Sequence, residues 1–438
     1  MAASVDFYRS GPPIDLLLPH ATDTRRRRSS STANASGHSF LSQVLRKEII
    51  KRMSLDIDDS FFVADLGEVY RQLVRWKHNL PRVEPFYAVK CNPDLKVLKL
   101  LQALGTGFDC ASQSEIDLVQ SLGVPTENII YANPCKAASH LRFAKHRNVK
   151  MMTFDNADEL YKVQRVYPEA HLLLRILTDD EKSLCRLGLK YGAPLHTTYG
   201  LLCLAKQLGL NVIGVSFHVG SGNDNDPAVF DDACVRARKV FDEALEVGFG
   251  DLQLLDIGGG FGHGNFDNIA HVLNHSIDKL FPPSVRVIAE PGRYFVSSAF
   301  TLAVNVIARR LSSDDVPPET AEEDVEKSVM YYVNDGVYGA FNCILFDHQQ
   351  PIPQILSHKC KFLHKQSPME HALVTDIVEK LADENGMVRC SIWGPTCDSL
   401  DCITRECALP CVLDIGDWLY FEDMGAYTTC ASTYVTIV

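Results

Sequence analysis

The sequence predicts an α/β fold, namely a (β/α)8 TIM-type barrel followed by a mostly β C-terminal domain. Eight short apolar runs alternate with helical patterns, which indicates a parallel sheet that is covered on both faces and closed into a barrel. The runs lie near residues 86–90, 107–111, 129–133, 150–154, 172–176, 212–219, 253–257 and 286–290. After Phe295 the apolar residues alternate with polar ones, which is typical of a half-buried β-sheet.

Two elements are expected before the first barrel strand, and helices between the later ones. Residues 61–65 predict a strand and residues 66–79 a helix. Among the helices between barrel strands, the pattern at 114–119 begins with Ser114 and Asp117, whose spacing and residue types suit a capping box.

The C-terminal β domain is expected to contain several strands and one exposed acidic insert at residues 312–327. Its strands are predicted at residues 301–306, 330–333, 392–393 and 417–421. The strand at 61–65 is also assigned to this domain, so the two domains do not divide cleanly in sequence. The predicted segments are a disordered tail (1–37), a part of the β domain (38–68), the barrel (69–310) and the remaining β domain (311–438).

Composition limits the class of protein. With 46% hydrophobic and 22% charged residues, the 438-residue chain resembles a soluble globular protein. No apolar stretch approaches the roughly 20 residues that cross a bilayer, so no membrane partner is expected. The net charge of -12 disfavours a nucleic-acid partner. Fourteen cysteines without metal-type pairs indicate a reduced, cytoplasmic enzyme with no bound metal.

The N-terminal tail carries a basic run at 25–28 that has two interpretations. It is either a solvated, disordered segment or a nuclear or plastid address. Asp6, Asp15 and Asp23 weaken the plastid interpretation, because transit peptides contain few acids.

Lys90 ends the first barrel run, at the face where barrel enzymes have their active sites. Burial at a strand end is expected to lower the pKa of this lysine and to make its amine nucleophilic. Such an amine can bond to an aldehyde cofactor, although a single lysine is more often an ordinary salt-bridge partner. The neighbouring motifs therefore decide the interpretation.

Three further motifs lie at strand ends. The glycine loop that follows Asp256 offers backbone N–H groups to a phosphate, although a glycine turn alone is a weak signal. Glu290 can hold a proton on a heterocyclic nitrogen, and Arg293 suits the phosphate site that barrels often form after strands seven and eight. His218 adds a flat ring. Together with Lys90, these residues predict a pocket for pyridoxal 5'-phosphate, the cofactor that acts as an electron sink.

From about Phe40 onward the chain resembles the eukaryotic ornithine decarboxylases, in particular plant-like members, which have an alanine-racemase-like barrel fold. The matching stretches are PFYAVKCNPD (85–94), FDCASQSEI (108–116), SFHVGSG (216–222), DIGGGFG (256–262), EPGRY (290–294), YYVNDGVYGAFNCILFDH (331–348), WGPTCDSLD (393–401) and GDWLYFEDMGAYT (416–428). The resemblance implies pyridoxal-phosphate-dependent decarboxylation of L-ornithine to putrescine in polyamine biosynthesis.

The resemblance also implies roles for individual residues. Lys90 would hold the cofactor covalently, His218 would stack on its ring, and Glu290 would be the partner of the ring nitrogen. Asp109 and Arg175 would lie beside the lysine. The remaining implied cofactor contacts, chiefly to the phosphate, are Ser221, Gly258, Gly259, Gly260, Arg293 and Tyr427.

On the substrate side, the resemblance implies that Cys397 returns a proton to the reacting carbon. Asp347 and Asp398 would bind the distal ammonium of a basic amino acid, because charge-assisted contacts offset its desolvation. Family members are homodimers with shared active sites, in which the Cys397 loop reaches in from the partner subunit.

Two positions depart from the common family pattern. Phe346 stands where many relatives have tyrosine, and Tyr434 stands where an aromatic residue without a hydroxyl is frequent. Both residues are assigned to the substrate pocket. Because one methylene changes recognition by only about 1–3 kcal/mol, lysine, which would give cadaverine, stays open as a second substrate.

Three alternatives remain beside this interpretation. A decarboxylase for another amino acid, such as arginine or diaminopimelate, is one, although Asp398 speaks against diaminopimelate. An alanine racemase fits less well, because this chain is longer and has the decarboxylase motif. The third is a catalytically silent homologue that binds regulatory proteins.

Overall fold

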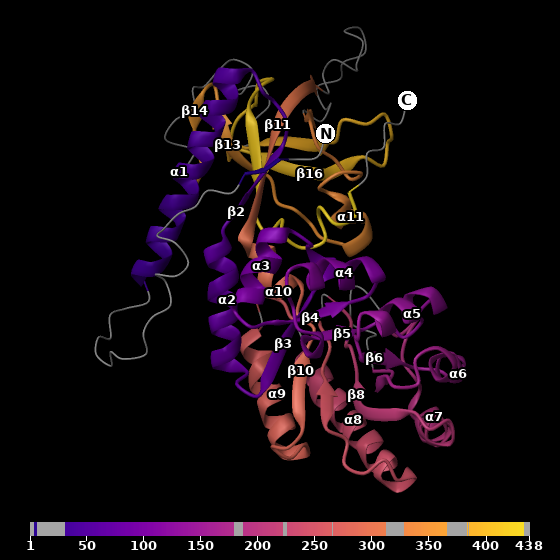
Figure 1. Ribbon diagram of the computed structural model, residues 1–438. Helices are drawn as coiled ribbons and strands as arrows, with labels where there is room; N and C mark the ends of the chain where they lie inside the picture. The colour runs from indigo at the N-terminus through magenta and orange to yellow at the C-terminus, as the bar shows by residue number, and fades with distance from the viewer. Residues whose placement is uncertain are drawn as a thin grey trace. The chain divides into compact units, whose positions relative to one another are not determined.

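The computed structural model describes residues 4–6, 31–178, 187–221, 226–264, 266–311, 328–365, 383 and 385–432, with side chains from Phe40 onward. The chain forms two compact units (Figure 1). The barrel unit comprises Leu66–Ala299 and Gly425–Cys430. The β unit comprises Met1–Asp65, Phe300–Met424 and Ala431–Val438.

The barrel unit contains a closed sheet of eight parallel strands, which confirms the predicted fold class. The strands follow one another in chain order from β3 to β10, and β10 pairs with β3 to close the barrel. They are β3 (Val83–Ala88), β4 (Gly107–Cys110), β5 (Ile129–Tyr131), β6 (Met151–Phe154), β7 (His171–Arg175), β8 (Asn211–Ser216), β9 (Leu254–Asp256) and β10 (Arg286–Ala289). All eight lie at or beside the predicted positions.

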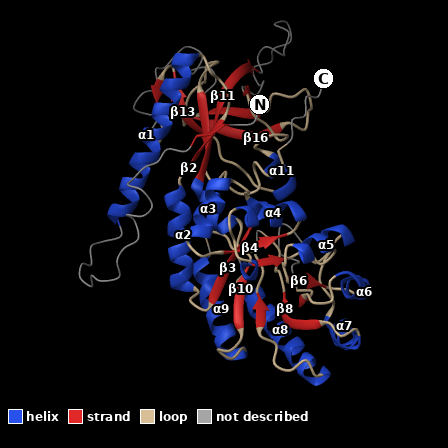
Figure 2. Ribbon diagram, in the orientation of Figure 1, coloured by secondary structure: helices blue, strands red, loops and turns tan. Residues whose placement is uncertain are grey.

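Helices surround the barrel strands (Figure 2). They are α2 (Leu66–Asn79), α3 (Leu95–Ala103), α4 (Gln113–Ser121), α5 (Ala138–His146), α6 (Ala157–Val166), α7 (Leu195–Gln207), α8 (Ala228–Val247), α9 (Phe266–Leu280) and the short α10 (Arg293–Val296). The described part of the unit also contains 3-10 turns at Val89–Cys91, Thr126–Asn128 and Ser297–Ala299. Helix α2 has the predicted bounds.

The predicted capping box of α4 is wrong in its residues. Ser112 is the N-cap, and its hydroxyl accepts a hydrogen bond from the N–H of Glu115 at 3.3 Å. The Glu115 carboxylate in turn accepts the N–H of Ala111. The box therefore begins two residues before Ser114, because β4 ends at Cys110 and leaves the turn at residues 111–112.

Apolar side chains fill the barrel interior and the layer beneath α2. The interior cluster consists of Phe86, Ile130, Met151, Leu173, Leu254 and Ile288, one residue from each of six strands. Outside it, the Trp76 ring of α2 stacks on Phe266 at a centroid distance of 5.3 Å and meets Phe261 edge-on at 4.9 Å. These contacts hold the strands rigid, so that the residues at their C-terminal ends keep fixed positions.

The β unit contains one sheet with the path β14-β13-β17-β11-β12-β15-β16, and β2 pairs with both β11 and β1. Its strands are β1 (Ser4–Asp6), β2 (Phe61–Ala64), β11 (Phe300–Leu311), β12 (Val329–Val333), β13 (Gln354–His358), β14 (Lys361–Phe362), β15 (Val388–Trp393), β16 (Cys402–Leu409) and β17 (Trp418–Phe421). The helices in its described residues are α1 (Ser31–Leu55) and α11 (Asn342–Asp347). The pairing of β2 with β11 agrees with the assignment of this N-terminal strand to the β domain.

The unit boundaries differ from the predicted ones. The barrel unit begins at Leu66 rather than at residue 69, and it also includes Gly425–Cys430, which was assigned to the β domain. Its main segment ends at Ala299 rather than at residue 310, because β11 pairs with β2, β12 and β17. Helix α1 begins at Ser31, inside the segment predicted as a disordered tail. The basic run at 25–28 and the acidic insert at 312–327 lie outside the described residues. Among the described helices, none is long and apolar enough to cross a membrane.

Candidate active site

Lys90 lies in the 3-10 turn Val89–Cys91, directly after β3. Its amine forms an ion pair with the Asp109 carboxylate at the end of β4, the neighbouring strand. The Lys90 side chain is 40% exposed, whereas that of Asp109 is fully buried. Asp109 Oδ1 is buried without a hydrogen-bond partner among the described residues. The pair therefore presents an amine at the mouth of the barrel, held from one side by a buried carboxylate.

The expected lowering of the Lys90 pKa is wrong for the chain without cofactor. Desolvation alone would lower the pKa of this amine, but the negative charges of Asp109 and Glu290 outweigh it and raise the pKa above the ordinary value of 10.5. Burial alone predicts a lowered pKa, and the amino-acid sequence does not show that these two carboxylates lie beside the amine. Lys90 is therefore charged here and must lose a proton before its nitrogen can act as a nucleophile.

Two carboxyl groups lie together at the ends of adjacent strands β9 and β10. Asp256 is fully buried, and its Oδ1 accepts the N–H of Gly258 at 2.9 Å. Burial raises the pKa of Asp256, and burial together with repulsion from Asp256 raises that of Glu290. A proton is thereby kept on this pair near neutral pH. Asp256 was not predicted as a site residue, although it begins the glycine motif.

The His218 ring has one defined orientation. Its Nδ1 accepts a hydrogen bond from the backbone N–H of Gly220 at 3.0 Å, so this nitrogen carries no proton. Burial and the positive charges of Arg175 and Lys90 lower the pKa of His218 well below its usual value. The ring is therefore neutral and flat, as stacking on a heterocycle requires.

The glycine loop after β9 leaves no space for side chains. A Cβ at Gly258 would lie 2.1 Å from the Phe217 carbonyl oxygen, and one at Gly259 would lie 2.7 Å from His218 Nε2. Gly258 and Gly260 also have φ values of +63° and +99°, which favour glycine. The loop thus brings bare backbone close to the imidazole, which is a suitable wall for a flat, anionic group.

Arg293, Ser221 and Tyr427 gather beside this loop. The Arg293 Nη2 donates to Ser221 Oγ at 3.4 Å, and its guanidinium lies 5.3 Å from the centroid of the Tyr427 ring. Tyr427 has a φ of +56°, and its N–H donates to the Cys91 carbonyl at 2.9 Å. The segment that contains Tyr427 thus brings its phenol close to the Arg293 guanidinium, which contacts the Ser221 hydroxyl. Such a group of donors suits an anion.

These residues fit pyridoxal phosphate. The bare glycine backbone with Arg293 suits a phosphate, the neutral His218 ring suits a pyridine face, and the proton kept on Asp256 and Glu290 suits a ring nitrogen. Lys90 supplies the amine. Arg175 ends β7, and its guanidinium lies 5.2 Å from the centroid of the Tyr191 ring.

The predicted substrate residues that are described lie in the β unit. Cys397 is exposed in the turn between β15 and β16, and Phe346 is 70% exposed in α11. Asp398 Oδ1 accepts the N–H of Leu400 at 2.9 Å. This bond and one from the Tyr338 hydroxyl hold the pKa of Asp398 below its usual value.

Asp347 is the last residue of α11, and its Oδ2 accepts a hydrogen bond from Nε2 of Gln349 at 2.5 Å. Tyr434, which was assigned to the substrate pocket, lies outside the described residues.

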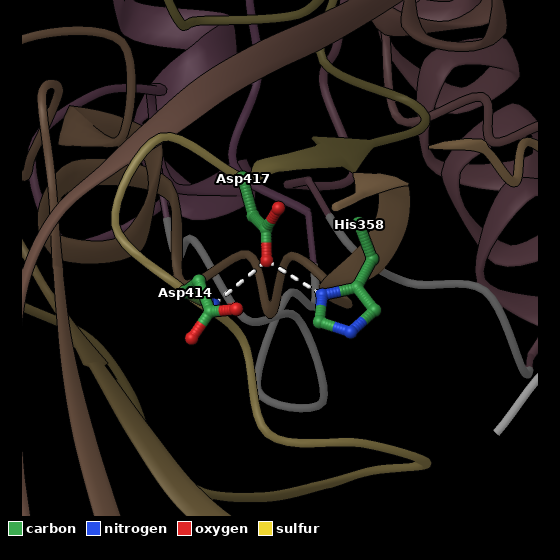
Figure 3. A group of neighbouring side chains, drawn as sticks. All are labelled: His358, Asp414 and Asp417. Atoms are coloured by element: carbon green, nitrogen blue, oxygen red, sulfur yellow. Dashed lines mark hydrogen bonds and ion pairs between the residues drawn. The ribbon is translucent and has the colours of Figure 1, made fainter. Parts of the chain in front are cut away.

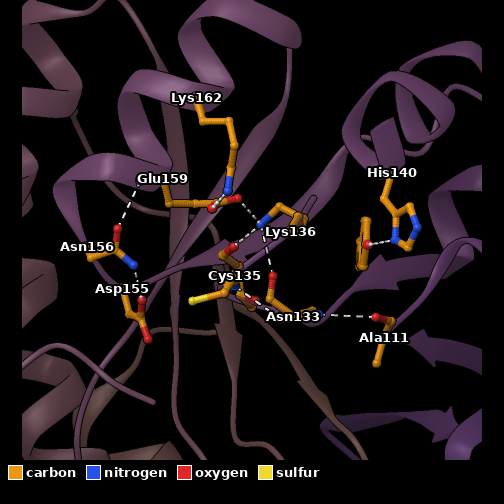
Figure 4. A network of polar contacts seen from close by, with 11 residues as sticks. Ala111, Asn133, Cys135, Lys136, His140, Asp155, Asn156, Glu159 and Lys162 are labelled. Atoms are coloured by element: carbon orange, nitrogen blue, oxygen red, sulfur yellow. Dashed lines mark hydrogen bonds and ion pairs between the residues drawn. The ribbon is translucent and has the colours of Figure 1, made fainter. Parts of the chain in front are cut away.

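A buried ion pair that the sequence did not predict lies after β5 (Figure 4). The fully buried Lys136 amine lies 3.0 Å from the Glu159 carboxylate and donates to the Thr153 carbonyl at 2.6 Å and that of Asn133 at 3.0 Å. Asn133 Nδ2 reaches the Ala111 carbonyl at 3.3 Å. The Lys136 cation thus connects the segment after β5 with Thr153 of β6 and Glu159 of α6.

His358, Asp414 and Asp417 form a second polar group, in the β unit (Figure 3). Asp417 Oδ2 contacts His358 Nδ1 and the N–H of Asp414, each at 2.7 Å, while its Oδ1 accepts the N–H of Lys359 at 2.9 Å. Arg309 pairs with Asp414 at 2.7 Å. Because both oxygens of Asp417 already accept hydrogen bonds, the group fastens the β13–β14 turn to the segment before β17.

Known proteins resemble the chain in sequence. The family described as pyridoxal-dependent decarboxylase, pyridoxal binding domain, matches residues 66–297. Ornithine decarboxylase of Schizosaccharomyces pombe is 53% identical over 96% of this chain and 90% of that protein. Antizyme inhibitor 2 of Xenopus laevis is 50% identical over 92% of this chain and 84% of that protein.

Solved structures resemble it in fold. The arginine decarboxylase of Paramecium bursaria Chlorella virus, bound to agmatine, has a TM-score of 0.76 and 34% identity, over 90% of this chain and 96% of that one. The lysine/ornithine decarboxylase from Vibrio vulnificus, complexed with cadaverine, has a TM-score of 0.72 and 28% identity, over 88% of this chain and 94% of that one.

Proposed function

The chain belongs to the pyridoxal-dependent decarboxylases, and we propose that it converts L-ornithine to putrescine and carbon dioxide. The observation that carries this proposal is the gathering of Lys90, His218 and Glu290 around the glycine loop of the barrel, in a chain whose relatives include many ornithine decarboxylases. The enzyme therefore acts in polyamine biosynthesis.

The cofactor is pyridoxal 5'-phosphate, which when bound withdraws electrons from the substrate carbon that loses its carboxylate. Lys90 would hold it covalently, and the glycine loop with Ser221, Arg293 and Tyr427 would bind its phosphate. His218 would support its ring, and Glu290 would keep a proton on the ring nitrogen. Burial and the neighbouring Asp256 favour the protonated state of Glu290 in the free chain, so the site holds this proton in advance.

The β unit supplies the groups that recognise and complete the substrate. Asp398 stays anionic because of its hydrogen bonds from Leu400 and Tyr338, which suits it to the distal ammonium of a diamino acid. Asp347 is the second carboxylate for that ammonium. Cys397 is exposed, so its Sγ is free to deliver a proton to the carbon that has lost carbon dioxide.

The functional enzyme is a homodimer with two shared active sites, in which Cys397 and Asp398 of one subunit complete the pocket of the other. Homodimers with two-fold symmetry are the commonest oligomers, and a site shared across the axis occurs twice. The proposed location is the cytoplasm. No observation on the described residues supports an address in the Arg-rich tail.

L-Lysine is the second candidate substrate, since the lysine/ornithine decarboxylase from Vibrio vulnificus shares this fold. The exposed Phe346 beside Asp347 lacks the hydroxyl of tyrosine, which changes the polar contacts near the distal ammonium. A purified chain supplied with equal ornithine and lysine decides the preference. An excess of putrescine over cadaverine supports the proposal, and an excess of cadaverine rejects ornithine as the main substrate.

The rival function is a silent regulatory homologue, because antizyme inhibitor 2 is as similar to this chain as many enzymes are. Incubation with pyridoxal phosphate and labelled ornithine separates the two. Release of labelled carbon dioxide, together with borohydride trapping of the cofactor on Lys90, supports the enzyme. Absence of both from a folded chain rejects it, and Lys90→Ala serves as the trapping control.

A further inference from the structure

Two cysteines face each other at the base of the loop that carries Cys397. Strands β15 and β16 form an antiparallel pair in which Cys390 is directly opposite Cys407. The chain between the two strands, residues 394–401, contains Cys397 and Asp398. The facing pair therefore lies on the two strands from which this loop projects.

The geometry of the pair is close to that of a disulfide. The two Sγ atoms are 3.3 Å apart, and the Cys407 thiol also lies 3.4 Å from the Cys390 carbonyl oxygen. Residues directly opposite each other in an antiparallel pair have Cβ atoms about 4.5–5.5 Å apart, and a disulfide needs about 3.5–4.5 Å. A small rotation of both side chains would close this gap without a change of strand register.

The two thiols differ in reactivity. A hydrogen bond from Cys390 lowers the pKa of Cys407, which is half-buried, whereas the same bond and burial raise the pKa of the buried Cys390. Burial also raises the pKa of Cys402 and of Cys411, which lie on or beside the same strand. Of Cys390, Cys402, Cys407 and Cys411, Cys407 is therefore the thiol that ionises most readily and can attack a disulfide.

We propose that Cys390 and Cys407 are a reversible thiol–disulfide site. A small disulfide such as oxidised glutathione is attacked at one sulfur by the Cys407 thiolate, which releases one glutathione thiolate and leaves a mixed disulfide. The Cys390 thiol then loses its proton and displaces the second glutathione. Two protein thiols are oxidised to one disulfide, and one oxidised glutathione is reduced to two thiols, so electrons and protons balance.

The cross-link would join the two strands from which the Cys397 loop projects. It would close a ring from Cys390 to Cys407 and reduce the freedom of the chain between them. Formation of the bond depends only on the geometry of the hairpin. Its influence on catalysis rests on the proposed role of Cys397, so the chemical test and the activity test can fail independently.

In the test, the enzyme with bound pyridoxal phosphate is incubated in buffers with an increasing ratio of oxidised to reduced glutathione. Each sample is then quenched with acid, alkylated and digested with trypsin. Cleavage after Arg389 and Arg405 separates Cys390, in peptide 390–405, from Cys407, in peptide 406–438. We expect a linked peptide pair whose mass is about 2 Da below the sum of the two, since two hydrogens are lost. Dithiothreitol should abolish it.

Matched variants identify the bond. The linked pair should disappear in Cys390→Ser and in Cys407→Ser but persist in Cys402→Ser and Cys411→Ser, which remove other thiols of the same two peptides. If a variant does not fold, alkylation of the wild type with an isotope-labelled reagent identifies which thiols are lost to the bond. Persistence of the link in Cys390→Ser, or mixed disulfides at Cys397 with no link at any ratio, would overturn the proposal.

Discussion

The backbone N–H of Gly220 donates a hydrogen bond to Nδ1 of His218 at 3.0 Å, and this bond fixes the imidazole beside the glycine loop. The opposite nitrogen, Nε2, would then lie 2.7 Å from a Cβ at Gly259. Because the ring is held at Nδ1, it cannot turn away from an added side chain without losing that bond. Ring position and loop sequence are thus coupled.

Gly259→Ala should therefore weaken cofactor binding. The added methyl group either displaces the His218 ring or is accommodated by a shift of the loop. We expect the Kd of pyridoxal phosphate to rise about tenfold to a hundredfold, since overpacking of this kind costs about 1–3 kcal/mol. Titration of the chain without cofactor, followed by cofactor absorbance, measures the change.

Gly200→Ala is the matched control. Gly200 is exposed in the middle of helix α7, and a Cβ there would meet no atom within 4 Å. The substitution should leave the Kd unchanged and stabilise the helix by about 0.5–1 kcal/mol. Equal Kd values for wild type and Gly259→Ala would show that His218 does not support the cofactor from this side.

Asp256→Asn should alter the pH dependence of stability in the chain without cofactor. Burial raises the pKa of Asp256 above its ordinary value of 3.8, so the folded state retains a proton that the unfolded state releases. Stability from this group is therefore present below about pH 4 and is lost as the pH rises toward the folded pKa. Asparagine does not titrate and should remove that loss.

The expected result is a variant that is more stable than wild type at pH 7 by about 1 kcal/mol or more, and whose advantage disappears near pH 4. Urea denaturation between these two pH values measures it. A difference between variant and wild type that stays constant across the range would mean that Asp256 is ionised in the folded chain.

The positions of the barrel strands could be predicted because each strand is a short apolar run that ends on polar residues. The location of Lys90 and Glu290 on one face of the barrel could be predicted for the same reason, since the C-terminal ends of the strands meet there. The pairing of β9 with β10 places Asp256 beside Glu290, yet one sequence gives no measure of their mutual repulsion. The direction of the Lys90 pKa shift depended on that same neighbourhood.

Other features depend on the exact ends of the strands or on the direction of a side chain, and the apolar pattern encodes neither. Ser112 rather than Ser114 caps α4 because β4 ends at Cys110, and strand ends are uncertain by a few residues in a sequence. Lys136 follows β5 in a polar segment where an exposed lysine is the usual expectation. Only the structure shows that the Lys136 side chain points inward, where it contacts Glu159 and the Thr153 carbonyl.

Lys136→Met should destabilise the barrel unit strongly. Among the described residues, the substitution leaves the buried Glu159 carboxylate with only its contact to Lys162 at 2.5 Å, and it removes the donor to two carbonyl groups. We expect a loss of about 3 kcal/mol in the free energy of unfolding. The double variant Lys136→Met with Glu159→Gln should recover part of it, because no buried charge remains.

Denaturation curves of the two variants and of Lys145→Met provide the comparison. Lys145 pairs with Glu169 on the surface, at 3.1 Å, and its removal should cost less than about 1 kcal/mol. Equal effects of Lys136→Met and Lys145→Met would show that burial of the pair contributes nothing to stability.

Mixed subunits test whether active sites are shared. Lys90→Ala cannot hold the cofactor covalently, and Cys397→Ala lacks the proposed proton donor, so each homodimer should be inactive. In a heterodimer, one site combines the native Lys90 of one subunit with the native Cys397 of the other. Random mixing makes half of the dimers heterodimers with one native site of two, so about a quarter of wild-type activity should return. Purification through separate tags on the two subunits removes the homodimers, and the resulting heterodimers should have about half of wild-type activity. Heterodimers with no activity, although each variant is folded, would place both residues of a site in one chain.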